Sequence, residues 1–147
     1  MSDTFDKNTR SWIMSRVQGE NTTPELVVQK FLRSLSIRFR SHYKKLPGHP
    51  DIVVPSVHLA IFVNGCFWHW HGCSRSRMPK TNVDYWKKKI KRNVLRDRRA
   101  RRDLRRLGWH YWTIWECSVA TSLPRLLGRV KSLQGCSRGA KRTRKVR

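Results

Sequence analysis

The spacing of apolar residues along the chain changes from the helical period to the strand period and back again. Residues 8 to 18 predict a short helix that ends before Gly19. A second helix is expected to open at Thr22 or Thr23 with Pro24, because proline is favoured in the first turn of a helix. The N-terminal part of the chain is therefore predicted to be helical.

The middle of the chain then follows a period of two. Residues 37–40 alternate as a half-buried strand does, and residues 46–50 read as a loop. Residues 51–54 and 57–63 predict a β-hairpin that turns at Pro55-Ser56. Its second strand is apolar on both faces, as a central strand would be.

The C-terminal half returns to helices. Residues 84–107 carry an apolar stripe that predicts a long helix, and 109–115 follow as a strand. Residues 118–134 predict a last helix, and 138–147 a basic tail that we expect to be disordered. The expected fold is α/β, one domain over residues 1–137 with an αβββαβ core, a mixed sheet and extra helices at both ends. This order resembles the core of the PD-(D/E)XK nucleases.

Charge is the next informative property. The chain has 33 Lys plus Arg against 9 Asp plus Glu, a net charge of +24, which favours a polyanionic partner. Positions 87–106 alone hold twelve basic residues and two acids. A solvated helix face is the ordinary explanation for a charge run, but one so one-sided indicates a phosphate-contacting surface. With no membrane-length apolar run and no signal peptide, we expect a soluble, intracellular protein.

Cysteines and histidines gather between residues 66 and 73, where aromatic rings separate them. Thiolates and imidazoles at such short spacing, with Cys117 added by folding, suit a tetrahedral zinc. Two disulfides are the alternative, which the absence of an export signal disfavours. Cys136 is left as an ordinary thiol. The rings held between the ligands would meet stacked bases, or else would pack in the core.

Asp51 is the candidate catalytic carboxylate. It follows Pro50 at the start of a predicted strand, where it could hold Mg²⁺ against a phosphodiester. An isolated Pro-Asp pair usually only caps a turn. Here the predicted hairpin brings it opposite Asn64, Cys66 and His69, and this clustering favours the catalytic interpretation.

Together these segments resemble the very-short-patch repair (Vsr) family of DNA mismatch endonucleases, from about Asp6 to Cys117. The motifs that carry the resemblance are Asp6 to Ser11 with Met14, Glu25, Leu46 to Asp51, Gly65 to His69 with His71 and Cys73, Asn93-Val94 with Arg96 to Arg99, and Leu107 to Trp109 with Trp115 to Cys117.

The resemblance implies a role for each matching position. Asp51 and the backbone carbonyl of Val63 would bind Mg²⁺, and His69 would be the general acid or base. Glu25 would orient water or a side chain nearby. Asn64 stands where a second catalytic histidine is described in the best-known member, and an amide cannot take up a proton at neutral pH. The structural zinc would be bound by Cys66, His71, Cys73 and Cys117.

The resemblance also implies DNA contacts and a reaction. Residues 1–20 would form a DNA-contacting arm. The residues that would contact DNA or enter the base stack are Phe67, Trp68, Trp86, Met14, Lys89 and Asn93. Opening a base step costs least at a mismatch, so rigid inserted rings would select for one.

The expected activity is nicking of one strand of double-stranded DNA next to a T:G mismatch left by deamination of 5-methylcytosine. The implied setting is the bacterial cytoplasm and nucleoid, beside a cytosine-5 DNA methyltransferase, with mismatch-repair proteins as further candidate partners. One alternative is a site-specific, restriction-type nuclease of the same fold that needs no mismatch. The other is a non-catalytic zinc-stabilised DNA-binding module, against which Asp51 argues.

Overall fold

A computed structural model describes residues 7–15 and 19–143. The helices are α1 (Lys7–Ser15), α2 (Thr23–Ser34), α3 (Val83–Arg106) and α4 (Val119–Thr143). The strands are β1 (Arg40–Ser41), β2 (Ile52–Val54), β3 (Leu59–Asn64) and β4 (His110–Trp115). Short 3₁₀ turns, η1 (Pro55–Val57) and η2 (Glu116–Ser118), follow β2 and β4.

The four strands form one mixed sheet in the order β1-β2-β3-β4. β2 and β3 are the predicted antiparallel hairpin, in which Val53 pairs with Ala60. β4 runs parallel to β3, and a parallel neighbour requires a crossover connection, which α3 supplies. β3 is therefore a central strand, as its uninterrupted apolar sequence predicted.

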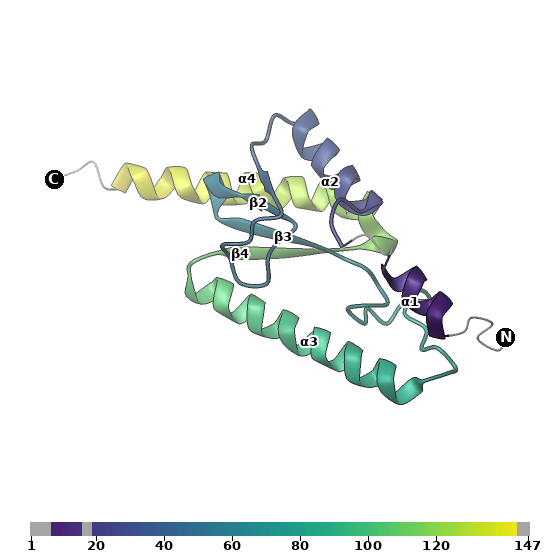
Figure 1. Ribbon diagram of the computed structural model, residues 1–147. Coiled ribbons are helices and arrows are strands. Elements are labelled where there is room, and N and C mark those ends of the chain that lie inside the picture. Colours follow the sequence, from purple (N-terminus) through teal and green to yellow (C-terminus); the bar gives the residue numbers. More distant parts are fainter. Residues whose placement is uncertain (1–6, 16–18, 144–147) are drawn as a thin grey trace.

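Helices cover both faces of the sheet. In Figure 1, α3 runs along one face, while α2 and α4 lie on the other. On the α2 and α4 side, Val28, Leu126 and Ile114 belong to one buried cluster. On the α3 side, Leu104 packs with Val53 and Ala60 in a second cluster. Removal of this apolar surface from water on both faces stabilises the three layers.

Two predicted elements differ in extent. The strand expected at 37–40 is only Arg40–Ser41, because Pro50 and Pro55 confine β2 to three residues and leave little to pair with. The last helix continues to Thr143, so residues 138–143, predicted as a disordered tail, are helical, and 144–147 lie outside the described residues. In the described ranges no helix has the length and apolar character needed to cross a membrane.

The loop before β2 touches α3 through backbone. Gly48 has φ +78°, and a Cβ added there would lie 2.5 Å from the Cβ of Ala100 and 3.2 Å from the Phe62 ring. Only glycine fits this approach, since both the space and the positive φ exclude a side chain. The loop and helix α3 are thereby held against each other at the position where the functional residues gather.

Candidate active site and metal centre

Asp51 lies directly before β2, and its Oδ2 atom accepts a hydrogen bond of 2.7 Å from the backbone N–H of Val63 on β3. Burial raises the pKa of Asp51 from 3.8 to about 6, although the Val63 hydrogen bond opposes the shift. The neighbouring Glu25 carboxylate contributes to this rise in pKa. A carboxylate with so little water and a second acid nearby is stabilised by a bound cation.

His69 is held by an acidic partner. Its Nδ1 atom lies 2.5 Å from Oδ2 of Asp97 on α3, and both side chains are about four-fifths shielded from solvent. The carboxylate of Asp97 accepts a hydrogen bond from Nδ1–H of His69, so Nε2 is the ring nitrogen left for proton exchange. Asn93, one helical turn before Asp97 on α3, donates a 3.0 Å hydrogen bond to the backbone carbonyl of Trp68. Two consecutive turns of α3 therefore hold Trp68 and His69 in place.

Glu25 is buried at the start of α2. Its carboxylate accepts hydrogen bonds from the backbone N–H of Asn21 at 2.9 Å and from the hydroxyl of Thr22 at 2.8 Å. These bonds satisfy polar groups at the helix N-terminus, where a carboxylate is favoured. Glu25 therefore caps α2 and at the same time places negative charge near Asp51.

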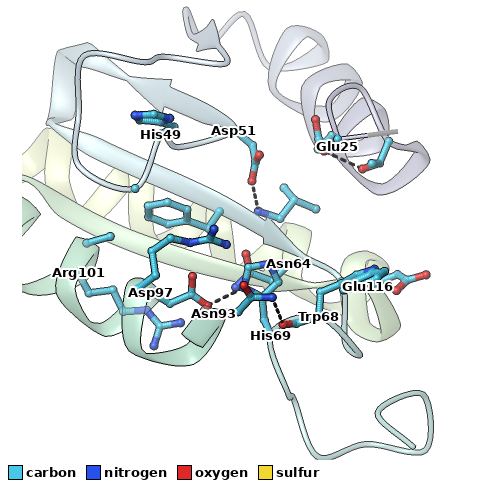
Figure 2. A pocket seen from close by; sticks show the side chains of 18 of the residues that line it. Glu25, His49, Asp51, Asn64, Trp68, His69, Asn93, Asp97, Arg101 and Glu116 are labelled. Atoms are coloured by element: carbon cyan, nitrogen blue, oxygen red, sulfur yellow. Dashed lines mark hydrogen bonds and ion pairs between the residues drawn. The ribbon is translucent and has the colours of Figure 1, made fainter. Parts of the chain in front are cut away.

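One cleft of about 1000 Å³ connects these groups. Figure 2 shows Asp51, Asn64, His69 and Asp97 around this space, with Glu25 on the α2 side. Asn64 is buried at the end of β3, between the Asp51 and His69 segments. Four basic residues of α3 also line the cleft, namely Lys89, Arg96, Arg99 and Arg101. The arrangement presents carboxylates and an imidazole to an anionic substrate.

A separate cluster of cysteine and histidine side chains lies where the loop after β3 meets the end of β4. The ligand atoms of Cys66, His71, Cys73 and Cys117 all lie within 4.8 Å of one another. Ligands of a tetrahedral zinc are roughly 3.3–3.8 Å apart, as follows from metal–ligand bonds of about 2.0–2.3 Å, so donors within 4.8 Å of one another lie close to the spacing that this ion needs. Burial raises the pKa of the Cys66 thiol, and a cation beside the sulfur would offset this cost of ionisation.

The imidazole of His71 also stacks on Trp115, with ring centroids 4.3 Å apart and an angle of 14° between the rings. Trp115 ends β4, two residues before Cys117. The cluster therefore joins the loop after β3 to the end of β4, and the stack fixes the orientation of its one imidazole.

Comparisons with known proteins show which family the chain belongs to. A family profile described as DNA mismatch endonuclease Vsr matches residues 2–75. The DNA mismatch endonuclease Vsr of Escherichia coli is 40% identical over 119 residues, which cover 81% of this chain and 76% of that protein. The chain belongs to the Vsr family. Family membership makes it a DNA endonuclease, a hydrolase of phosphodiester bonds.

Two further relatives carry the name of nicking enzymes. A type II nicking enzyme of Xanthomonas oryzae pv. oryzae is 44% identical over 120 residues, covering 82% of this chain and 88% of that enzyme. A type II nicking enzyme of Neisseria meningitidis serogroup A is 36% identical over 119 residues, covering 81% and 85%.

The rings expected to contact DNA form one cluster. Phe67 and Trp68 are half-buried and lie 5.1 Å apart between ring centroids, and Trp86 is buried beneath them at 5.3 and 5.9 Å. Lys89 places its ammonium 5.2 Å from the centre of the Trp68 ring. Only Trp68 of the three rings lines the cleft. The side chain of Met14 lies outside the described residues.

Sequence reasoning assigned no role to Asp97. Its signal was present, because it is an acid inside a strongly basic run, four residues after Asn93 on the same side of a predicted helix. What the sequence could not give is the distance to His69, which lies 28 residues away in the chain.

Proposed function

We propose that this protein is a Mg²⁺-dependent endonuclease that nicks one DNA strand next to a T:G mismatch arising from 5-methylcytosine deamination, and so starts very short patch repair. The observation that carries the proposal is a single cleft that contains a desolvated carboxylate, Asp51, and an imidazole bound to a second carboxylate, His69 with Asp97. The name of the Escherichia coli relative supports the mismatch substrate.

Asp51 and the backbone carbonyl of Val63 would bind the Mg²⁺. One oxygen of Asp51 is taken by the Val63 N–H, which leaves the other for the ion. When bound, Mg²⁺ stabilises negative charge on the phosphoryl oxygens and makes a bound water more acidic. The fit rests on the donor chemistry, since carboxylate and carbonyl oxygens are the ligands that Mg²⁺ prefers.

His69 would exchange the proton in the reaction. Asp97 fixes the ring by accepting from Nδ1 and stabilises the imidazolium when Nε2 takes up a proton. Asn64 would orient a water or a phosphate oxygen by hydrogen bonding. Glu25, already engaged with its own helix terminus, would act on the site through its charge and the Asp51 environment.

Zinc would be the ion in the Cys66, His71, Cys73 and Cys117 cluster. Four protein ligands leave no open position, so the ion would be structural. We place the sheet and its flanking helices in the PD-(D/E)XK nuclease class, which the αβββαβ order and the position of Asp51 support.

The DNA would lie along the cleft, with the Trp68 face of the aromatic cluster against the base stack. Phe67 would extend this face and Trp86 would support both rings from below, as its burial favours. Lys89 and Asn93 would contact the duplex from α3, and Met14 from the N-terminal arm, residues 1–20. In this role the protein would work on bacterial nucleoid DNA beside a cytosine-5 methyltransferase and mismatch-repair proteins.

A site-specific nicking enzyme without a mismatch requirement is the second candidate, and the names of the Xanthomonas and Neisseria relatives favour it. Single-turnover nicking of T:G and matched C:G duplexes of the same sequence separates the two. We expect Mg²⁺-dependent nicking of the T:G duplex only. Equal nicking of both duplexes would establish the second candidate.

Variants of two tryptophans sharpen this assay. Trp68→Ala should reduce discrimination between T:G and C:G duplexes more than it reduces affinity, because inserted rings sense how easily a step opens. Trp70→Ala is the matched control, since Trp70 is exposed and does not line the cleft. Equal loss on both duplexes would make Trp68 a packing residue.

The position of Asn64 gives an independent test of proton transfer. Asn64→His adds a titratable group between the Asp51 and His69 segments, so a second ionisation should appear in the pH dependence of nicking. Activity should be kept or raised. A collapse of activity would show that the amide itself is needed for alignment.

A further inference from the structure

The basic residues of α3 divide into two sets that the sequence shows as one run. Of the twelve Lys and Arg between positions 87 and 106, four line the cleft. The other eight are exposed and lie outside it. Charges that do not face the substrate cleft need a different explanation from those that do.

Four of the eight form a row that we call the outer stripe. It consists of Lys87, Lys91, Arg98 and Arg102, all solvent-exposed. At 3.6 residues per turn these four lie within about 60° of each other around the helix, and the row is about 22 Å long. The eight α3 positions that line the cleft are centred roughly 180° away, although Arg101 at their edge lies about 40° from Lys87. A duplex in the cleft therefore lies on the opposite side of α3.

Little in the described residues neutralises the outer stripe. Arg102 reaches Asp103 at 3.2 Å, and that carboxylate is shared with Arg106 at 4.0 Å. No ion pair within residues 7–15 and 19–143 involves Lys87, Lys91 or Arg98. Like charges spaced four residues apart destabilise a helix by about 0.2–0.5 kcal/mol per pair, so the stripe opposes folding unless an anion offsets it.

We propose that the outer stripe binds a second segment of duplex DNA while the cleft holds the first. The inference rests on the proposed function, because it takes the cleft as the site of the first duplex. A straight, unbranched row of cations matches the phosphate backbone, which carries one charge per about 1.7 Å of duplex. A lipid surface fits less well, since a helix that lies on a membrane needs a free apolar face. The apolar face of α3, including Trp86, Ile90 and Leu104, is buried against the rest of the protein.

The consequence is that one protein molecule can hold two DNA segments. A second contact of this kind would keep the enzyme near DNA when the cleft releases one site, and would allow direct transfer between segments. The contact would be sequence-independent and sensitive to salt, because it consists of phosphate contacts alone.

The experiment measures bridging by the full-length protein without Mg²⁺. A T:G duplex is fixed to beads, the protein is bound to it, and capture of a second, fluorescent matched duplex is measured from about 50 to 200 mM salt, the range over which phosphate contacts weaken strongly. The test variant replaces the outer stripe by glutamine, as Lys87→Gln, Lys91→Gln, Arg98→Gln and Arg102→Gln. The control variant loses the same charge from exposed positions outside α3, as Lys30→Gln, Arg38→Gln, Arg125→Gln and Lys131→Gln.

We expect the outer-stripe variant to capture at least tenfold less of the second duplex, and the control variant to stay within twofold of the parent. The log–log salt dependence of capture should become shallower by about 3 to 4, at about 0.9 per lost phosphate contact. Nicking of a single T:G duplex should remain within twofold for both variants. Thermal unfolding of the outer-stripe variant at or above the parent temperature shows that it folds.

Three results would overturn the proposal. One is undiminished capture by the outer-stripe variant, and another is an equal loss in the control variant. The third is a bridged complex whose mass contains two protein chains rather than one, which would place the bridge between proteins. If the outer-stripe variant loses binding to vesicles of anionic lipid while its capture of the second duplex is unchanged, the stripe binds membranes instead. Binding to the bead-bound T:G duplex is measured before capture of the second duplex. If the parent neither binds nor nicks this first duplex, the proposed function itself fails.

Discussion

Replacing Asp51 with asparagine should stabilise the protein in the absence of Mg²⁺. In the folded chain burial raises the pKa of Asp51 from 3.8 to about 6, so ionising this group at neutral pH opposes folding. At about 1.4 kcal/mol per pH unit, the shift corresponds to an upper value of ~3 kcal/mol. The amide side chain of the Asp51→Asn variant would carry no charge at any pH, and its oxygen can still accept the Val63 hydrogen bond.

The sign of the pH dependence follows from the raised pKa. Between pH 3.8 and about 6 the folded state binds more protons than the unfolded state, so parent stability falls as pH rises through this window. The advantage of Asp51→Asn should therefore be near zero below about pH 4, grow through the window and level off above about pH 7. Urea unfolding followed by tryptophan fluorescence, at several pH values on both sides of the window, measures it.

Two additions make the result specific. Asp84→Asn is the matched control, because Asp84 is exposed in the first turn of α3, where a carboxylate stabilises the helix, so its loss should be slightly destabilising. Added Mg²⁺ should stabilise the parent and leave Asp51→Asn unchanged. A variant with no gain above the window, or with a gain that does not depend on pH, would refute the argument that Asp51 is a desolvated carboxylate awaiting a cation.

Three further changes test other parts of the structure. Cys117→Ser should lower zinc content and thermal stability, because zinc binding is linked to folding. Cys136→Ser, at an exposed position outside the cluster, should change neither. Full zinc occupancy in the Cys117→Ser variant would contradict the proposed ligand set. Asp97→Asn should slow single-turnover nicking at least tenfold with DNA affinity kept, because an amide supplies no negative charge beside the His69 ring; an unchanged nicking rate would deny Asp97 its positioning role. Gly48→Ala should destabilise the fold by about 2–4 kcal/mol in urea unfolding, because overpacking and a positive φ act together. Gly108→Ala is the control with a positive φ but no atom within 4 Å of the added Cβ, and it should lose about 1–2 kcal/mol. Equal losses would show that the close approach of Gly48 to α3 does not contribute to the free energy of unfolding.

The elements of the fold were predictable because hydrophobic period reports which face of a segment is buried. The hairpin of β2 and β3 and the long helix α3 have strong, uninterrupted patterns, and both are confirmed. The strand expected at 37–40 was wrong in extent because its pattern describes burial alone. Ile37 and Phe39 do pack against the core, but pairing depends on the length of the partner strand.

The functional residues were predictable only where they are close in sequence or matched a family motif. The four-residue cluster of Cys66 and its partners combined both signals, and the structure brings its ligand atoms together. Asp97, the acidic partner of His69, lies inside the Arg96 to Arg99 motif, but it is 28 residues away from His69 in the chain and the resemblance attached no role to it. The split of the α3 charges into cleft-lining and outer sets was equally hidden, because a run of basic residues does not show which side of the helix the sheet will cover.

The close approach of Gly48 to Ala100 fixes the spacing of the two walls of the cleft at one point. The walls meet there through a glycine Cα and a methyl group, so the backbone sets their spacing at this point, whereas long basic side chains line other parts of the cleft. Under the proposed function, a fixed spacing at this point would favour a duplex that deforms easily, and a duplex is softest where its pairing is defective. This preference would come from the shape of the cleft and would add to the discrimination that we propose for the Trp68 ring.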